Sequence, residues 1–270
     1  MIDMERFKAY LQEEELTQNT IDNYMEGMRQ FAERYDEVNK TNALDFKAYL
    51  TSCKSPKTVN LRIRAVVKYS QCIGEPITVK TLKVPKMTSV ENVISSEQYQ
   101  RLIEGLKADG KTNWLFNITL LARTGMRISE ALKVKKIDLL NGQVTMFTKG
   151  KYRKIIFPQS LIADFDEYLS DFNDNDLVMR GRQWKNKEKP LTSRGVDGAL
   201  TRFGKAYGIP KEVLHPHSFR HFFAIEFVKR NKNIALLADL LGHSGMNITQ
   251  IYLRQSEGSQ INAVNDAVDW

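Results

Sequence analysis

His215-Pro-His-Ser-Phe-Arg-His221-Phe-Phe-Ala224 is the stretch from which this 270-residue chain is best interpreted, since all four of its histidines lie between residues 215 and 243. A helix that begins near His217 places His217, Arg220 and His221 on one face, because residues three and four apart are neighbours on a helix. The rest of that helix carries Phe219, Phe222, Phe223 and Phe227. Such a helix is expected to be largely buried, and a polar strip on a buried helix needs partners or a function.

Two interpretations of this polar strip compete. His217 and His221 have the spacing of metal ligands, and a zinc site could draw on all four histidines: His215, His217, His221 and His243. However, no Asp or Glu occupies residues 218–220, and no thiolate is near, because Cys53 and Cys72 are the only cysteines. The other interpretation is an Arg/His pair that faces a phosphate, with arginine offering a bidentate fork and histidine a titratable proton.

Upstream of this helix, the segment Arg123-Thr-Gly-Met-Arg-Ile-Ser-Glu130 joins two predicted helices. Gly125 is expected to end the first helix, and Arg127 lies at the start of the next. Arg127 and Glu130 share a face at this spacing, so the simplest interpretation of the pair is an intrahelical ion pair.

A basic hairpin is predicted between these segments. Residues 142–147 and 154–157 have the composition of short strands, and the turn between them, residues 148–153, is basic. The turn and its flank carry Lys149, Lys151, Arg153 and Lys154. A lysine in such a turn is normally solvated, and the alternative is that it reaches into a phosphate-bearing groove.

Downstream, Leu240-Leu-Gly-His243 closes another apolar helix, and Tyr252 follows nine residues after His243. A tyrosine between Ile251 and Leu253 is most often a core residue. The run from Ile234 to Arg254 also resembles a helix-turn-helix with its turn at residues 242–245, which leaves open a DNA-binding regulator without catalysis.

The charge of the chain points to a polyanionic partner, either nucleic acid or an anionic membrane. Lys and Arg number 40 against 32 Asp and Glu, which gives a net charge of +8. Residues 1–50 hold 6 basic and 11 acidic residues, whereas residues 51–90 hold 8 basic and 1 acidic. The positive excess therefore begins after the first 50 residues.

The helix expected after Ser55-Pro56 has two different faces. Val59, Ile63 and Val66 would pack on one face, and Lys57, Arg64 and Lys68 would form a cationic ridge on the other. The ridge is either a solvated surface or a set of DNA phosphate contacts.

Capping signals divide the chain into two regions. Helices are expected after Thr17, after an N-cap at Asn42, and from Ser55-Pro56 to Gly74. A new helix begins at Ser95, which forms a capping box with Gln98. In the second region we expect helices at 96–107, 112–123, 127–133, 160–169, 195–206, 217–229 and 233–241, with a last amphipathic stretch from Ile261 to Val268. The prediction is a helical domain at 1–84, a linker at 85–94 and a second domain at 95–270.

Several protein classes are not supported by the sequence. Residues 1–10 lack the apolar core of a signal peptide, and the most apolar stretch, 114–122, is too short to span a bilayer. The two cysteines form no C-x-x-C, and there is no Walker or G-x-G-x-x-G loop. We therefore expect a cytoplasmic protein that has no membrane partner.

Taken together, five segments resemble the tyrosine recombinase or phage integrase family: residues 124–130, 148–150, 217–221, 240–243 and 249–252. Their order agrees with that family, and so does the nine-residue step from His243 to Tyr252. The resemblance covers nearly the whole chain and is closest to compact Xer-like or mobile-element enzymes. It implies a mainly α fold with a small β-sheet: an all-α, SAM-like core-DNA-binding domain, then an α+β catalytic domain with a C-terminal tail helix.

The resemblance implies a site-specific recombinase that cuts and rejoins DNA strands for integration, excision or resolution. Tyr252 would be the nucleophile and would form a 3′-phosphotyrosyl intermediate. Arg127 and Arg220 would hold the non-bridging oxygens of the scissile phosphate, where charge develops in the transition state. His217 would accept the tyrosine proton as general base.

The remaining family positions complete this expected site. His243 would hydrogen-bond a phosphate oxygen, and Lys149 would protonate the departing 5′-oxygen. Glu130 and His221 would have supporting roles. Neither a metal nor another cofactor is expected, because the phosphotyrosyl ester conserves the energy of the broken bond.

The resemblance also implies partners. The enzyme would bind double-stranded DNA core sites, clamped between its two domains. It would act as a homotetramer on two DNA sites or together with a paired recombinase. The stretch from Ile261 to Val268 would dock on a neighbouring protomer or fold back on its own domain. A protein of this kind would be associated with the nucleoid. A nicking-closing enzyme like a type IB topoisomerase shares the chemistry and is the other catalytic alternative.

Overall fold

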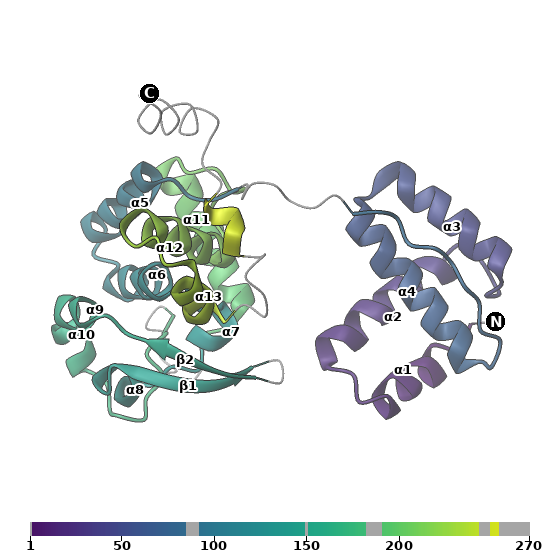
Figure 1. The fold of residues 1–270 in the computed structure, drawn as a ribbon, viewed down its shortest axis with the longest axis horizontal. Coiled ribbons are helices and arrows are strands. Elements are labelled where there is room, and N and C mark those ends of the chain that lie inside the picture. Colours follow the sequence, from purple (N-terminus) through teal and green to yellow (C-terminus); the bar gives the residue numbers. More distant parts are fainter. Residues whose placement is uncertain (1, 85–91, 149–150, 182–190, 243–248, 254–270) are drawn as a thin grey trace, which may run out of the picture. The chain divides into compact units, whose positions relative to one another are not determined.

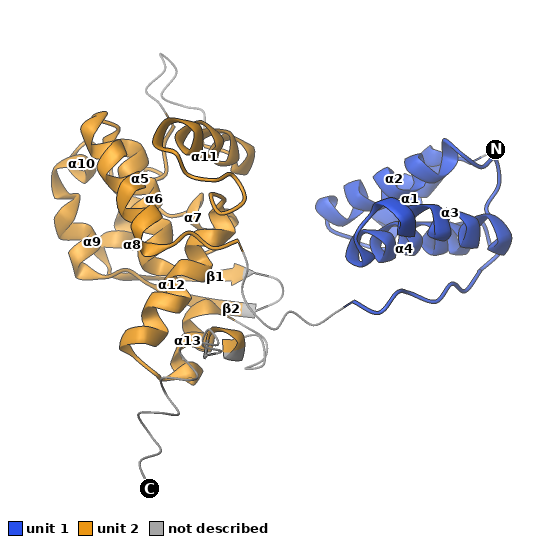
Figure 2. Cartoon of the chain, turned by 90° about the horizontal axis from the view of Figure 1, so that it is seen from above, with its two compact units in different colours: residues 1–86 blue, residues 87–270 orange. Residues whose placement is uncertain are grey.

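A computed structural model describes residues 2–84, 92–148, 151–181, 191–242 and 249–253 of the chain. The chain forms two compact units, Met1–Lys86 and Met87–Trp270 (Figure 2). None of the helices within the described ranges is long and apolar enough to cross a membrane.

The first unit consists of helices α1 (Met4–Glu13), α2 (Gln18–Ala32), α3 (Lys40–Cys53) and α4 (Pro56–Cys72). Helix α2 packs along α4, and α1 and α3 pack against this pair. The sequence places Thr17 correctly before α2, and Ser55 caps α4, where it accepts a hydrogen bond from the Thr58 N–H.

The predicted N-cap of α3 is wrong. The helix begins at Lys40, so its N-cap is Asn39, whose side chain accepts a hydrogen bond of 2.8 Å from the backbone N–H of Asn42. Asn42 is therefore the donor in this cap rather than the capping residue. Either asparagine is a competent cap by type, and the Asn42 side chain instead donates to the Glu37 carbonyl.

Helix α4 has the two faces that the sequence predicts. Val59, Ile63 and Val66 are buried in the core of the first unit, together with residues of the other three helices such as Phe7, Phe31 and Phe46. Lys57 and Arg64 are exposed.

The second unit is mainly α with one small sheet, which confirms the expected fold class (Figure 1). Its helices are α5 (Ser96–Ala108), α6 (Thr112–Thr124), α7 (Ile128–Ala131), α8 (Lys136–Leu140), α9 (Gln159–Asp164), α10 (Asp166–Ser170), α11 (Ser193–Tyr207), α12 (Pro216–Arg230) and α13 (Ile234–Leu241), with a 3₁₀ turn η1 (Gln250–Leu253). Strands β1 (Gln143–Thr148) and β2 (Lys151–Ile156) pair antiparallel, from Gln143 opposite Ile156 to Thr148 opposite Lys151.

Three local differences from the sequence prediction have visible causes. Helix α7 begins one residue later than expected because Arg127 has an extended backbone, and it ends two residues earlier, at Ala131. Helix α8 is not among the expected helices, and it starts where the Asp138 carboxylate accepts a hydrogen bond from the Lys135 N–H. The single helix expected at 160–169 is two helices, since the backbone of Phe165 leaves the helical region between α9 and α10.

Helix α6 lies at the centre of the second unit and is buried on nearly all sides, with Phe116, Ile118, Leu120 and Leu121 in the core. A helix that is apolar all round is buried all round. Helix α12 packs against α6, and α13 contacts both α12 and β2. The start of α7, the hairpin, α12 and the end of α13 therefore meet in one region.

Candidate active site

The start of α12 is fixed by a side chain from the histidine-rich segment. His215 is its N-cap, and the His215 Nδ1 accepts a hydrogen bond of 3.1 Å from the Ser218 N–H. Pro216 fits the first turn, where a backbone N–H is not needed. The Ser218 hydroxyl accepts a hydrogen bond of 2.8 Å from the Ile94 N–H, which ties α12 to the segment before α5. The residues that follow are thereby held in a defined orientation.

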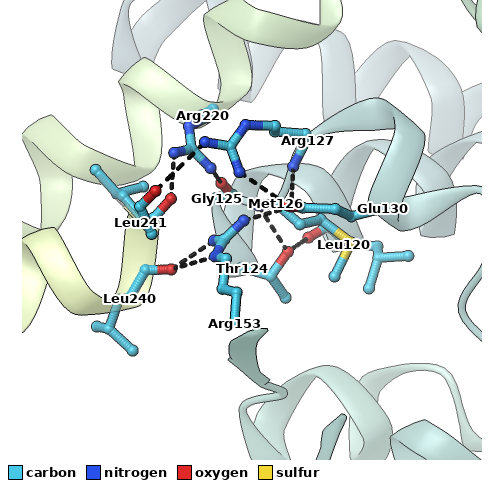
Figure 3. A network of polar contacts seen from close by, with 11 residues as sticks. Leu120, Thr124, Gly125, Met126, Arg127, Glu130, Arg153, Arg220, Leu240 and Leu241 are labelled. Atoms are coloured by element: carbon cyan, nitrogen blue, oxygen red, sulfur yellow. Dashed lines mark hydrogen bonds and ion pairs between the residues drawn. The ribbon is translucent and has the colours of Figure 1, made fainter. Parts of the chain in front are cut away.

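Three arginines meet the C-terminal end of α13 (Figure 3). Arg153 donates from Nε to the Leu240 carbonyl at 3.1 Å, Arg220 donates to the Leu241 carbonyl, and Arg127 donates from Nη2 to the Gly242 carbonyl at 3.5 Å. Each of three successive carbonyls thus receives one guanidinium. The last carbonyls of a helix lack partners within the helix and carry partial negative charge, so this contact is favourable.

Glu130 is the acidic partner of this cluster. Its Oε1 accepts from Arg127 Nη1 at 2.9 Å, its Oε2 accepts from the Arg127 backbone N–H at 2.8 Å, and its carboxylate also pairs with Arg153. Burial opposes its ionisation, but the Arg127 N–H and the charges of Arg153 and Arg127 outweigh burial, and the pKa of Glu130 is lowered. The pair that the sequence places on one face is therefore part of a buried three-residue network.

Arg220 is 2% exposed, and its Nη1 donates to the Gly125 carbonyl at 2.8 Å. Gly125 ends α6 in the left-handed conformation, as expected, and a Cβ at this position would collide with the Phe223 ring. Burial, followed by the charges of Arg153 and Arg127, lowers the pKa of Arg220 to about 9, so the side chain stays charged at neutral pH. The cluster contains three guanidiniums and one carboxylate, a balance that suits an anionic ligand.

The two histidines of α12 differ in their surroundings. His217 is exposed, and its ring meets the ring of His221 edge to face, with centroids 4.5 Å apart. Partial desolvation and then the nearby charges of Arg220, His215 and Arg127 lower the pKa of His217, which makes its ring neutral at pH 7. His221 is half-buried, and its Nδ1 lies 2.6 Å from the Tyr252 hydroxyl.

Tyr252 lies on η1, which packs against α12, and it is 9% exposed. Burial raises the pKa of Tyr252 to about 12, although the Arg220 charge acts in the opposite direction. Its hydroxyl is therefore protonated at neutral pH, and it would need a base to act as a nucleophile. The structure pairs this hydroxyl with His221, whereas the family resemblance assigns the proton to His217.

The structure brings Arg127, Glu130, His217, Arg220, His221 and Tyr252 together in the second unit. Lys149, His243 and the stretch from Ile261 to Val268 lie outside the described residues, as does most of the 242–245 turn of the helix-turn-helix alternative. Among the described residues there is no group of three or more histidine, cysteine or acidic side chains arranged to hold a metal.

The cationic residues of α4 belong to the first unit. Lys57 and Arg64 are exposed, but Lys68 pairs with Glu14 at 3.0 Å and lies 5.2 Å from the centre of the Tyr10 ring. The ridge in this structure thus has two open cations and one that is already paired.

Arg153 is a residue of the cluster that the sequence does not distinguish from the hairpin lysines beside it. The usable signal was the period of two in β2, which puts Arg153 on the same face as Ile155. Both side chains are buried, whereas Tyr152, Lys154 and Ile156 on the other face are exposed.

Comparisons with known proteins show the family of the chain. The model of the phage integrase family matches residues 92–258. Tyrosine recombinase XerA of Pyrococcus furiosus is 32% identical over 259 residues, which cover 93% of this chain and 88% of that protein.

Two solved structures share the fold. The Tn1549 transposon integrase in complex with transposon right end DNA has a TM-score of 0.71 at 18% identity and covers 99% of both chains. A lambda integrase dimer bound to a COC′ core site has a TM-score of 0.71 at 17% identity and covers 93% of this chain and 76% of that chain. The chain therefore belongs to the phage integrase family and is a site-specific tyrosine recombinase, a DNA strand-transferring enzyme.

Proposed function

We propose that Tyr252 attacks a phosphodiester of double-stranded DNA and forms a 3′-phosphotyrosyl intermediate with release of a 5′-hydroxyl. The observation that carries this proposal is the position of the buried Tyr252 phenol against α12, close enough to Arg220 for the guanidinium charge to act on it. Attack by a 5′-hydroxyl from a second duplex then restores the phosphodiester and exchanges the strands.

Arg127 and Arg220 hold the non-bridging oxygens of the scissile phosphate in this mechanism. A guanidinium presents paired donors that match a phosphate, and charge grows on these oxygens in the five-coordinate transition state. Glu130 holds the Arg127 guanidinium in place, and the carbonyls of Gly125 and Leu241 hold that of Arg220.

His217 and His243 complete the phosphate contacts, and Lys149 protonates the departing 5′-oxygen. His217 suits this role because it is exposed beside Arg220 and neutral at pH 7. The phosphotyrosyl ester retains the energy of the broken phosphodiester, so rejoining requires no nucleotide. Two fixed guanidiniums supply the charge stabilisation that a metal ion supplies in other phosphoryl-transfer enzymes.

DNA core sites are the partners that this mechanism needs. The solved structures of the Tn1549 and lambda integrases contain DNA, which supports the same ligand for this chain. In the first unit, Lys57 and Arg64 are exposed on α4 and are the proposed phosphate contacts, with Lys68 available after exchange from Glu14. A homotetramer on two sites, with the 261–268 stretch docked on a neighbouring protomer, would allow exchange between duplexes. Such an enzyme would be found with the nucleoid.

A nicked suicide duplex tests the proposal, because loss of the short 5′ strand after cleavage traps the intermediate. We expect a protein–DNA adduct that survives SDS and is absent with Tyr252→Phe. Equal adduct formation by Tyr252→Phe would refute the nucleophile assignment.

A strand-exchange assay with two marked duplexes separates recombination from the topoisomerase-like alternative. Recombination predicts joined products that carry both marks. Relaxation of supercoiled DNA with no exchanged product would favour a nicking-closing enzyme.

A further inference from the structure

The hydrogen bond of the Tyr252 phenol goes to the second histidine of α12. We propose that His221 is the general base that accepts the Tyr252 proton during strand cleavage, and that His217 serves the phosphate instead. This inference rests on the proposed function, because it takes Tyr252 as the nucleophile.

His221 is close enough to the Tyr252 hydroxyl to accept its proton. The Nδ1 of His221 lies 2.6 Å from the Tyr252 hydroxyl oxygen, which is within the distance required of a base that takes this proton. Within the described part of the chain, His217 makes no hydrogen bond to this hydroxyl. Its ring contacts His221, whose ring in turn contacts Tyr252, with centroids 5.7 Å apart.

The Tyr252 phenol needs a base before it can attack a phosphate. A buried phenol with a pKa of about 12 is almost fully protonated at neutral pH and is a weak nucleophile. Removal of its proton during attack overcomes this, and a neutral imidazole is the side chain best suited to do so near pH 7. For the phenol O–H to donate to Nδ1, His221 must carry its own proton on Nε2.

The two histidines of α12 lie in different parts of the site. His217 is exposed at the start of α12, where a phosphate held by Arg127 and Arg220 can reach it, whereas His221 is half-buried one helical turn further, beside the nucleophile. The edge-to-face contact with His217, at 83° between ring planes, supports the orientation of the His221 ring. Each histidine thus faces a different reacting group.

Cleavage exchanges one bond at phosphorus and moves two protons. The Tyr252 Oη forms a bond to phosphorus while the bond from phosphorus to the 5′-oxygen breaks. The phenol proton moves to Nδ1 of His221, and the 5′-oxygen receives a proton from the general acid. In the rejoining step the attacking 5′-hydroxyl returns its proton to that acid, and His221 returns its proton to Tyr252.

The test compares His221→Asn with His221→Ala in single-turnover cleavage of the suicide duplex. Asparagine keeps a hydrogen-bonding atom near the position of Nδ1 but cannot accept a proton at neutral pH. We expect both variants to bind the duplex as the wild type does and to form adduct roughly 10²–10⁴-fold more slowly. A near-wild-type rate for His221→Asn would overturn the proposal, because it would show that the residue only positions the phenol.

Two altered reactants identify which proton is affected. Fluorotyrosine installed at position 252 has a lower phenol pKa and depends less on a base, so it should restore part of the missing rate in His221→Asn. A duplex with sulfur in place of the bridging 5′-oxygen has a leaving group that needs no proton, and it should restore nothing. The reverse pattern would place His221 at the leaving group and overturn the proposal.

Failure of the His221 assignment can be distinguished from failure of the proposed function. If Tyr252→Phe forms no adduct but both His221 variants react at the wild-type rate, Tyr252 is the nucleophile and only the base assignment fails. If a His221 variant does not fold, the fluorotyrosine substitution in the otherwise unchanged chain still tests whether cleavage depends on a base. A base-dependent wild type should be slowed little by fluorination, and an enzyme limited by the nucleophilicity of a free phenolate should be slowed strongly, which would refute the assignment.

Discussion

Replacement of Arg153 by methionine tests the buried part of the site. This change keeps an unbranched side chain but removes the ion pair to Glu130 and the hydrogen bonds to the Leu240 carbonyl. The side chains of Arg153 and Glu130 are 5% and 1% exposed, so the carboxylate that remains is almost fully buried. The expected result is a large loss of stability in the second unit.

The size of the stability loss follows from what happens to Glu130 and to the Leu240 carbonyl when Arg153 is removed. Removal of one member of a buried ion pair typically costs about 3–5 kcal/mol because the other charge is left without its partner. Glu130 keeps two hydrogen bonds from Arg127, which places the loss of stability near the lower limit, at about 3 kcal/mol. The freed Leu240 carbonyl adds to this cost only where water cannot reach it.

The pH dependence of this loss of stability has a definite sign. The pKa of Glu130 is lowered in the folded wild type, in part by Arg153, so its ionised form stabilises the fold above the pKa of the unfolded chain, and that contribution disappears as pH falls through the folded pKa. Without Arg153 the pKa of Glu130 rises. The stability difference between wild type and Arg153→Met should therefore shrink as the pH falls through the glutamate range towards the lowered pKa of Glu130 in the wild type.

Urea unfolding followed by tryptophan fluorescence measures this difference. All three tryptophans of the chain, Trp114, Trp184 and Trp270, belong to the second unit, so the signal reports that unit alone. Lys154→Met is the matched control, because Lys154 is exposed on the opposite face of β2, and it should change the free energy of unfolding by less than about 0.5 kcal/mol. Equal effects of the two substitutions, or a destabilisation by Arg153→Met that does not shrink at low pH, would refute the reasoning.

Two further predictions concern a glycine and the cationic residues of α4. Gly242 has a φ of +61°, and a Cβ there would lie 2.5 Å from the Cδ of the buried β2 arginine, whereas Gly142 has a φ of +69° with open space around it. Gly242→Ala should therefore lower the thermal midpoint more than Gly142→Ala and also slow adduct formation; equal shifts would show that the arginine moves freely. Replacement of Lys57 and Arg64 by alanine should weaken DNA binding at all sequences and flatten the dependence of log K on log salt by about one for each phosphate that the variant no longer neutralises. Lys68→Ala should have a smaller effect because Lys68 is paired in the free protein, and an unchanged slope for the first two variants would remove α4 from the interface.

Local sequence signals were sufficient for much of the fold. The capping box of Ser95 with Gln98, the Ser55-Pro56 start and the Gly125 end depend on side chains within three or four residues, so the sequence identifies them correctly. The two faces of α4 follow from helical periodicity alone. The errors occur where local signals tie or are weak, as between Asn39 and Asn42 or at the four- and five-residue helices α7 and α8.

The site was harder to predict than the fold. The sequence motifs identify which residue types are present, but the contact between His221 and Tyr252 joins residues that are 31 positions apart. The contacts that bury Arg153 span 23 positions to Glu130 and 87 to Leu240. No local pattern encodes such distances, so the sequence indicates neither the contact between His221 and Tyr252 nor the buried position of Arg153.

The arrangement at the end of α13 has a consequence for how the site loses its structure. The hairpin, the start of α7, α12 and the end of α13 each contribute a charge or a carbonyl to the same cluster, so the release of any one of them exposes an unmatched charge in a buried place. Partial opening is therefore unfavourable, and backbone amides of these four elements should exchange with deuterium as one cooperative group. In the mechanism proposed above this cooperativity is a safeguard, because a second unit that has lost part of the arginine cluster is scarcely populated.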